Sequence, residues 1–200
     1  MESKSLSIDL LRHGDTTAGA SFIGSTDAAL IAEGWQQMQQ AVGDHVHYDA
    51  VISSPLIRCH AFAERFAVKN KIPLVVEDNF REIFFGEWEG MTSESVWEKD
   101  SEALLAFWQD PIKYPATGGE NIEKFHQRVL RTFLQLPDRY PNQQILVVAH
   151  GGTIRSILTW LLGSNLRHSN RINIAHGGLS RIRIAYDDDG FYPVLEFLNR

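Results

Sequence analysis

The sequence predicts an α/β fold in three layers, α/β/α, with a mostly parallel central sheet. Strand-like apolar runs alternate with helix-period segments through most of the chain, which is typical of a parallel sheet covered on both faces. Residues 145–149 form a continuous apolar run, as expected for a strand buried on both faces. Apolar and polar residues alternate near the end of the chain, which indicates an antiparallel hairpin. We expect the 200 residues to form one domain.

The first half of the chain contains three predicted strands and two predicted helices. The strands are expected at residues 5–12, 48–53 and 74–76. A loop with Gly14, Gly19 and Gly24 follows the first strand. The helices are expected at 30–42 and 56–68, and Pro55 suits the first turn of the second helix.

The second half adds further helices and the terminal hairpin. One or two helices are expected at 92–109, another at 121–136 that ends at Pro137, and a last one at 153–162. The strand at 145–149 precedes the last helix. The hairpin strands are expected at 179–186 and 194–198, with a turn at 187–190.

Composition excludes several classes of protein. The net charge of −6 does not support general nucleic-acid binding, which usually needs a basic face. No apolar run approaches the ~18 residues of a membrane helix, and the N-terminus lacks a signal-peptide core, so a cytoplasmic protein is expected. Cys59 is the single cysteine, so no internal disulfide forms, and neither a metal nor a cofactor is expected. The oligomeric state is not set by the sequence.

Two predicted strands end in the same pattern of residues. Arg12-His13-Gly14 follows the first strand, and His150-Gly151-Gly152 follows the strand at 145–149. Loops after the carboxyl ends of neighbouring parallel strands converge on one crevice, so the two histidines are expected to face each other. The glycines before a helix provide backbone N–H groups that suit an anion. With Arg58 after a third strand, these residues predict a phosphate pocket.

Five motifs in order carry a resemblance to a known family. They are Arg12-His13-Gly14-Asp15-Thr16, Ser53-Ser54-Pro55-Leu56-Ile57-Arg58, Arg81-Glu82 with the aromatic stretch after it, Gly118-Gly119-Glu120, and Ala149-His150-Gly151-Gly152. Together they resemble the histidine phosphatase superfamily, the clan of the cofactor-dependent phosphoglycerate mutases. The resemblance implies a phosphoglycerate mutase-like fold, and the α-ribazole phosphatases are the branch that looks most similar.

The resemblance implies a role for each site residue. His13 would be the nucleophile that forms a phosphohistidine. Arg12 and Arg58 would bind the phosphoryl oxygens, with His150 as a further donor that is most useful when protonated. Glu82 would protonate the leaving alkoxide and then activate water. Gly151 would contribute to substrate binding through its backbone, and no metal would be needed.

Structural explanations compete with these roles. Each histidine and arginine could serve packing or a surface ion pair, and four other acidic residues lie near Glu82: Glu77, Asp78, Glu87 and Glu89. His45 and His47 suggest a metal pair, but a solvated loop is the preferred interpretation. Cys59 is expected to be packed, and no role is assigned to His60, His126, His168 and His176.

Three positions depart from the family pattern. Asp15 stands where Glu is usual, which we expect to matter little, and Phe62 occupies a position often held by Thr. Gly19 lies where mutases usually carry a phosphate-contacting Asn. The last departure weakens the mutase alternative more than the phosphatase one.

The segment at about 84–120 is expected to form a lid that selects the substrate. Residues 91–117 hold five acidic residues and two lysines. This negative balance does not suit a phosphoglycerate mutase, which must bind a substrate carboxylate and a bisphosphate cofactor. The segment is also aromatic, with Trp97, Phe107, Trp108 and Tyr114, and Trp88 just before it. Such rings either stack on a planar leaving group or pack the lid on the core.

The preferred hypothesis is hydrolysis of α-ribazole 5′-phosphate to α-ribazole and phosphate in cobalamin nucleotide-loop assembly. The partner is then a small-molecule phosphate ester, with no nucleic acid and no membrane. The alternatives are a broad sugar or nucleotide phosphatase, a phosphoglycerate mutase-like phosphotransferase, and a non-enzymatic phosphoryl-binding module. An acid at Glu82 has no use in a mere binder, which argues against the last alternative.

Overall fold

A six-stranded sheet runs through the molecule in the order β3-β2-β4-β1-β5-β6. The computed structural model describes residues 4–43, 47–187 and 190–200. The strands are β1 (Lys4–Arg12), β2 (Ala50–Ser53), β3 (Leu74–Val76), β4 (Gln144–Ala149), β5 (Leu179–Tyr186) and β6 (Phe191–Phe197). The first four strands in that order are parallel, whereas β5 and β6 are antiparallel. The mostly parallel sheet and the terminal hairpin are therefore confirmed.

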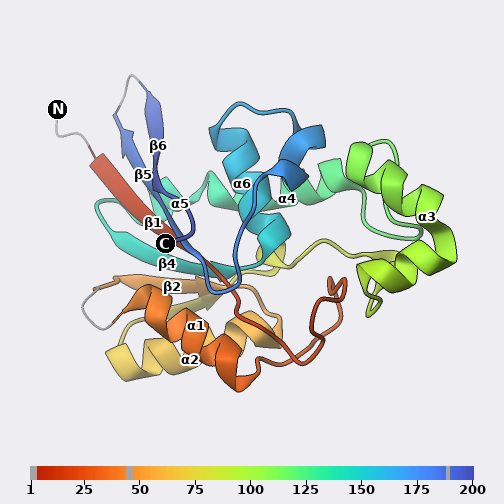
Figure 1. Ribbon diagram of the computed structural model, residues 1–200. Coiled ribbons are helices and arrows are strands. Elements are labelled where there is room, and N and C mark those ends of the chain that lie inside the picture. Colours follow the sequence, from red (N-terminus) through yellow and green to blue (C-terminus); the bar gives the residue numbers. More distant parts are fainter. Residues whose placement is uncertain (1–3, 44–46, 188–189) are drawn as a thin grey trace.

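Helices cover both faces of the sheet and complete the predicted three layers (Figure 1). Helices α1 (Ala32–Val42) and α2 (Ile57–Asn70) pack on one face through a core that includes Met38, Phe62 and Val148. Helices α4 (Ile122–Phe133) and α6 (Gly151–Leu161) pack on the other face. Because β4 is apolar on both sides, it contributes to both cores.

Helix α3 (Ser93–Gln109) lies beside the sheet rather than on it (Figure 1). The helix is bent at Asp100, where φ is −158°. One or two helices were expected in this segment, and the structure has one helix with a kink. Its apolar residues form a small cluster of their own with Trp88, Val96, Leu104 and Phe107. No helix among the described residues has the length and apolar character to span a membrane.

Four predicted helix boundaries differ from the structure by two or more residues. The helix expected at 30–42 begins at Ala32, and the one expected at 56–68 ends at Asn70. The helix expected at 121–136 ends at Phe133, and Pro137 lies in the first turn of the short helix α5 (Leu136–Arg139). Proline is tolerated there because the first turn needs no donor from its backbone nitrogen. The last helix begins at Gly151, two residues earlier than expected, so both glycines belong to its first turn.

A buried ion pair joins the middle of β1 to the hairpin. Asp9 is fully buried, and both of its carboxylate oxygens accept hydrogen bonds from Arg181, at 2.6 and 2.9 Å. The Tyr48 hydroxyl also donates to Asp9, at 2.5 Å. Burial, together with this carboxylate, raises the pKa of Tyr48, so the phenol keeps its proton.

We expect Asp9→Ala to lower the free energy of unfolding by about 2–4 kcal/mol, because it leaves Arg181 without its partner. Urea denaturation measures the loss. The matched control is Glu196→Ala, which breaks the exposed pair with Arg183 on the same hairpin and should cost less than about 1 kcal/mol. Equal losses in the two variants would contradict this account of β1.

Candidate active site

The two predicted histidines lie side by side because β1 and β4 end together. Arg12 pairs with Ala149 in the parallel register, and the next backbone N–H, that of His13, donates to the Ala149 carbonyl at 3.0 Å. The imidazole rings of His13 and His150 are 5.3 Å apart between centroids and meet edge to face. The predicted convergence of the two strand ends is therefore present.

Hydrogen bonding fixes which nitrogen of His13 can react. The ring is 4% exposed, and Nδ1 lies 2.8 Å from the Gly14 carbonyl oxygen. A carbonyl only accepts, so Nδ1 carries the proton and Nε2 carries the lone pair. Burial lowers the pKa of His13 well below its usual value, against the opposing bond to Gly14, and the charges of Arg58 and Arg12 lower it further. His13 is therefore neutral near pH 7, as a nucleophile requires.

Arg12 presents a buried cation with an unused donor. One terminal nitrogen donates to the Ile174 carbonyl at 2.6 Å, whereas Nε has no hydrogen-bond partner among the described residues. A Cβ atom at Gly151 would lie only 3.2 Å from this Nε, so the absence of a side chain there lets the first turn of α6 pack closely against the guanidinium. Burial lowers the pKa of Arg12 to about 10, with Glu82 opposing, so the guanidinium stays charged. An anion would satisfy it.

Arg58 and His150 form a buried layer behind His13. Arg58 Nε donates to His150 Nδ1 at 3.2 Å, so the other ring nitrogen carries the proton and donates to Ser54 Oγ at 2.7 Å. The terminal nitrogens of Arg58 donate to three carbonyls, those of Ile23, Gly24 and Thr26. Burial, followed by Arg58, lowers the pKa of His150 well below its usual value. His150 is thus neutral in this structure rather than protonated, because burial and the neighbouring charge of Arg58 both disfavour a positively charged ring.

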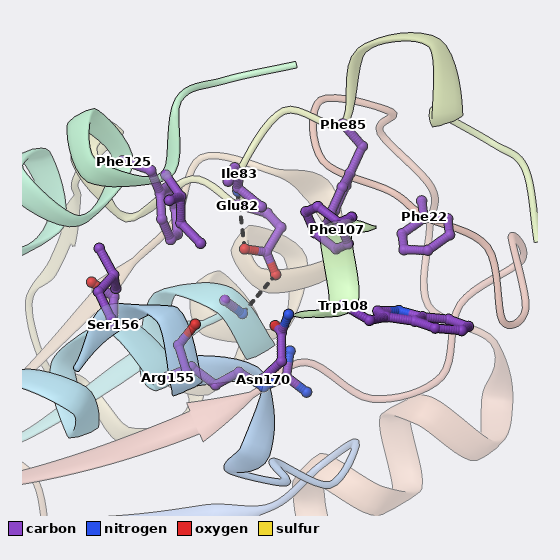
Figure 2. Close-up of a pocket in the computed structure, with 14 residues that line it drawn as sticks. Phe22, Glu82, Ile83, Phe85, Phe107, Trp108, Phe125, Arg155, Ser156 and Asn170 are labelled. Atoms are coloured by element: carbon purple, nitrogen blue, oxygen red, sulfur yellow. Dashed lines mark hydrogen bonds between the residues drawn. The ribbon is translucent and has the colours of Figure 1, made fainter. Parts of the chain in front are cut away.

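Glu82 lies at the N-terminus of α6. Its two carboxylate oxygens accept hydrogen bonds from the backbone N–H groups of Gly152, at 2.9 Å, and Ile83, at 3.0 Å. Figure 2 shows the carboxylate pointing into a pocket between Phe85 and Arg155. The helix end that the sequence offers to an anion is therefore partly occupied by a protein carboxylate.

Arg128 on α4 holds the backbone that carries Glu82. Its guanidinium donates to the Glu82 carbonyl at 3.1 Å and makes a two-pronged ion pair with Glu120 at 2.8 and 2.9 Å. It also donates to the carbonyls of Asn79 and Arg81. These bonds fix the position of Glu82 from behind.

Two cavities meet at this carboxylate. The first, of about 230 Å³, is lined by Arg12, His13, Gly151 and His176, among others. The second, of about 280 Å³, is lined mainly by apolar and aromatic side chains, including Ile83, Phe107, Trp108 and Phe125 (Figure 2). Four residues line both: Phe22, Glu82, Phe85 and Arg155. Arg58 and His150 line neither cavity.

A family model identifies this arrangement. The model of the histidine phosphatase superfamily, branch 1, matches residues 8–197. The chain belongs to this superfamily and is a phosphatase of it.

Two curated bacterial proteins are similar to this histidine phosphatase. One is named "Putative phosphoserine phosphatase 2", from Hydrogenobacter thermophilus, with 30% identity over 96% of this chain and 94% of the relative. The other is an adenosylcobalamin/alpha-ribazole phosphatase of Escherichia coli, with 30% identity over 77% of this chain and 78% of the relative. The crystal structure of an alpha-ribazole phosphatase from Shigella flexneri superposes with a TM-score of 0.83 at 28% identity, over 97% of this chain and 96% of that one.

The structure of this histidine phosphatase distinguishes Glu82 from the four other acidic residues near it in the sequence. Glu89 accepts hydrogen bonds from the backbone of Gly24, Ser25, Thr26 and Phe85, so it joins the loop after β1 to the segment before α3. Glu77 pairs with Arg139, and Glu87 pairs with Lys99. Glu82 is the one among the five candidates that lines the cavities.

Several residues of the cavities were not predicted from the sequence. Arg155 lies one turn into α6 on the wall of both cavities, and Ser54 holds His150. His176, which was given no role, lines the His13 cavity, with its ring centroid 5.5 Å from that of His13. The sequence could have indicated a role for His176, because His176-Gly177-Gly178 repeats the pattern of His150-Gly151-Gly152.

His47 and Cys59 have the surroundings that were expected of them. His47 is exposed, and His45 lies outside the described residues. Within the described part of the chain, no group of three His, Cys, Asp or Glu side chains is arranged to hold a metal. Cys59 is buried against His150, and burial raises the pKa of its thiol, so it is packed as predicted.

We expect Gly152→Ala to displace Glu82, because the new Cβ would lie 2.2 Å from its Oε1. If Glu82 supplies a proton, kcat/KM falls about 10²-fold or more for alkyl phosphate esters. The loss should be less than tenfold for p-nitrophenyl phosphate, whose leaving group needs little protonation. Thermal melting controls for folding, and equal losses on both ester types would contradict this role of the carboxylate.

Proposed function

We propose that this protein hydrolyses α-ribazole 5′-phosphate through a phosphohistidine on His13. The observation that carries the proposal is the aromatic cavity that shares Glu82 with the His13 cavity. A phosphoryl group beside His13 places its ester oxygen near Glu82 and its leaving group among Phe107, Trp108 and Phe125. A benzimidazole riboside suits such walls by stacking.

The proposed reaction has two half-reactions. The lone pair of His13 Nε2 attacks phosphorus while Glu82 protonates the departing ribose oxygen. Glu82 then takes a proton from a water molecule, which attacks the phosphohistidine and releases phosphate. Arg12 and the Gly151 backbone bind the phosphoryl oxygens throughout.

Arg58 and His150 contribute from behind His13 in this mechanism. Arg58 places a positive charge close to the reacting group, and its contact with His150 keeps both side chains in position. Residues 84–120 would act as the lid of a single domain, with Phe107 and Trp108 as its contribution to the leaving-group cavity.

Phosphoserine is the second candidate substrate. Its leaving group carries a carboxylate, and Arg155 is a cation on the wall of both cavities. The relative from Hydrogenobacter thermophilus supports the same candidate. Against it, the cavity beyond Arg155 is mostly apolar, which suits a serine zwitterion less well than an aromatic ring.

We expect His13→Ala to abolish release of phosphate from p-nitrophenyl phosphate, and EDTA to leave the wild-type activity unchanged, because protein side chains supply the stabilising charges. Brief mixing of wild-type enzyme with ³²P-labelled substrate and denaturation in alkali, where phosphohistidine survives, should trap label on His13. Persistent turnover in His13→Ala would refute the assigned nucleophile.

We expect kcat/KM for α-ribazole 5′-phosphate to exceed those for phosphoserine, phosphoglycerates and sugar phosphates. Trp108→Ala should lower kcat/KM about fivefold for α-ribazole 5′-phosphate, through loss of stacking worth about 1 kcal/mol, and leave the value for phosphoserine nearly unchanged. Trp97→Ala is the matched control, because Trp97 is an exposed ring of the same helix outside the cavity lining. A wide preference for phosphoserine would overturn the assigned substrate.

A further inference from the structure

The segment before β5 is fastened to the end of β1 at three points. Arg12 donates through its side chain to the Ile174 carbonyl at 2.6 Å and through its backbone to the Gly178 carbonyl at 3.1 Å. Gly177 donates in turn to the His13 carbonyl at 3.2 Å. These bonds hold His176, in the middle of the segment, against the His13 cavity.

The orientation of the His176 ring is set by Asp15. Nδ1 of His176 lies 2.6 Å from Asp15 Oδ1, and the other carboxylate oxygen accepts a hydrogen bond from Gln37 at 2.7 Å. The Asp15 backbone N–H donates to the same glutamine side chain at 3.0 Å. Nδ1 therefore carries a proton toward Asp15, and no protein group of the described residues bonds to Nε2.

The charges around His176 are arranged to respond to an anion. Burial lowers the pKa of His176, and Arg12 lowers it further, whereas Asp15 opposes both. The other titratable groups on the cavity wall are His13, Glu82 and Arg155. The free ring is therefore neutral near pH 7, with a lone pair on Nε2. A bound phosphoryl group would add negative charge and favour the protonated ring.

We propose that His176 is a further catalytic residue, whose Nε2 shares one proton with a non-bridging phosphoryl oxygen. A monoanion brings this proton as its P–OH group, and a dianion acquires it from solvent. The proton moves between oxygen and Nε2 while no other bond changes, and Asp15 stabilises the imidazolium that results. The inference rests on phosphate binding beside His13 but not on the identity of the ester.

The proton count on phosphate binding tests the proposal. Calorimetric titration of the full chain with inorganic phosphate at pH 8, in two buffers of different ionisation enthalpy, should give an uptake of about one proton per phosphate bound. The wild-type affinity should fall about tenfold between pH 8 and pH 9, because the bound state holds one proton more than the separate dianion and neutral ring.

Two substitutions at the same position separate proton transfer from packing. His176→Asn keeps a donor for Asp15 and loses Nε2, so proton uptake falls to near zero and the affinity no longer changes between pH 8 and pH 9. His176→Gln reaches into the cavity with an amide that does not titrate, so it binds phosphate more tightly than His176→Asn, also without proton uptake. Glu82→Gln removes the carboxylate among the other titratable groups of the wall and should retain the uptake.

The outcomes distinguish this proposal from the proposed function. Unchanged uptake in both His176 variants, or loss of uptake in Glu82→Gln alone, would overturn the role of His176 while leaving His13 as the nucleophile. Failure of the wild-type protein to bind phosphate at all would overturn the phosphoryl site and both proposals with it.

Discussion

The parallel register of β1 and β4 determines where the reactive groups lie. Pairing runs from Ser7 with Gln144 to Arg12 with Ala149, so the two strands end at one level and each delivers a histidine there. Both faces of β4 are apolar, and polarity alone would not prevent a slip of one residue. The shape of the side chains packed on each face fixes the register, because close-packed cores tolerate few changes of fit. The position of the site is thus a consequence of core packing.

Burial gives the site its electrostatic character. His13 and His150 are both buried beside arginines, and both effects favour the neutral imidazole. Neither His13 nor His150 therefore adds charge to that of Arg12 and Arg58 near pH 7. A phosphoryl anion bound beside His13 would meet fixed, partly buried cations, whose interactions with it are stronger than in bulk water.

The sequence predicted the sheet and the strand-end residues well because both depend on local patterns. A continuous apolar run located β4, and His-Gly pairs marked the ends of β1 and β4. The contacts of Arg58 with the carbonyls of Ile23, Gly24 and Thr26 depend on how a glycine-containing loop folds back, which no local pattern encodes. The same holds for Arg128 behind Glu82. Of the lid aromatics, Phe107 and Trp108 line the cavity, whereas Trp97 and Tyr114 do not, and this division depends on tertiary packing that a local pattern does not encode.

The two cavities are lined largely by different parts of the fold. The His13 cavity lies at strand ends of the main sheet, whereas Phe107 and Trp108 of α3, which has a small core of its own, form part of the lining of the aromatic cavity. Glu89 links the two parts through the loop after β1, and Glu82 lies on the wall that both cavities share. In the proposed mechanism, Glu82 is therefore placed to protonate an ester oxygen located where the two cavities meet. Changes in α3 can then alter which ester fits while the geometry around His13 stays as β1 and β4 set it.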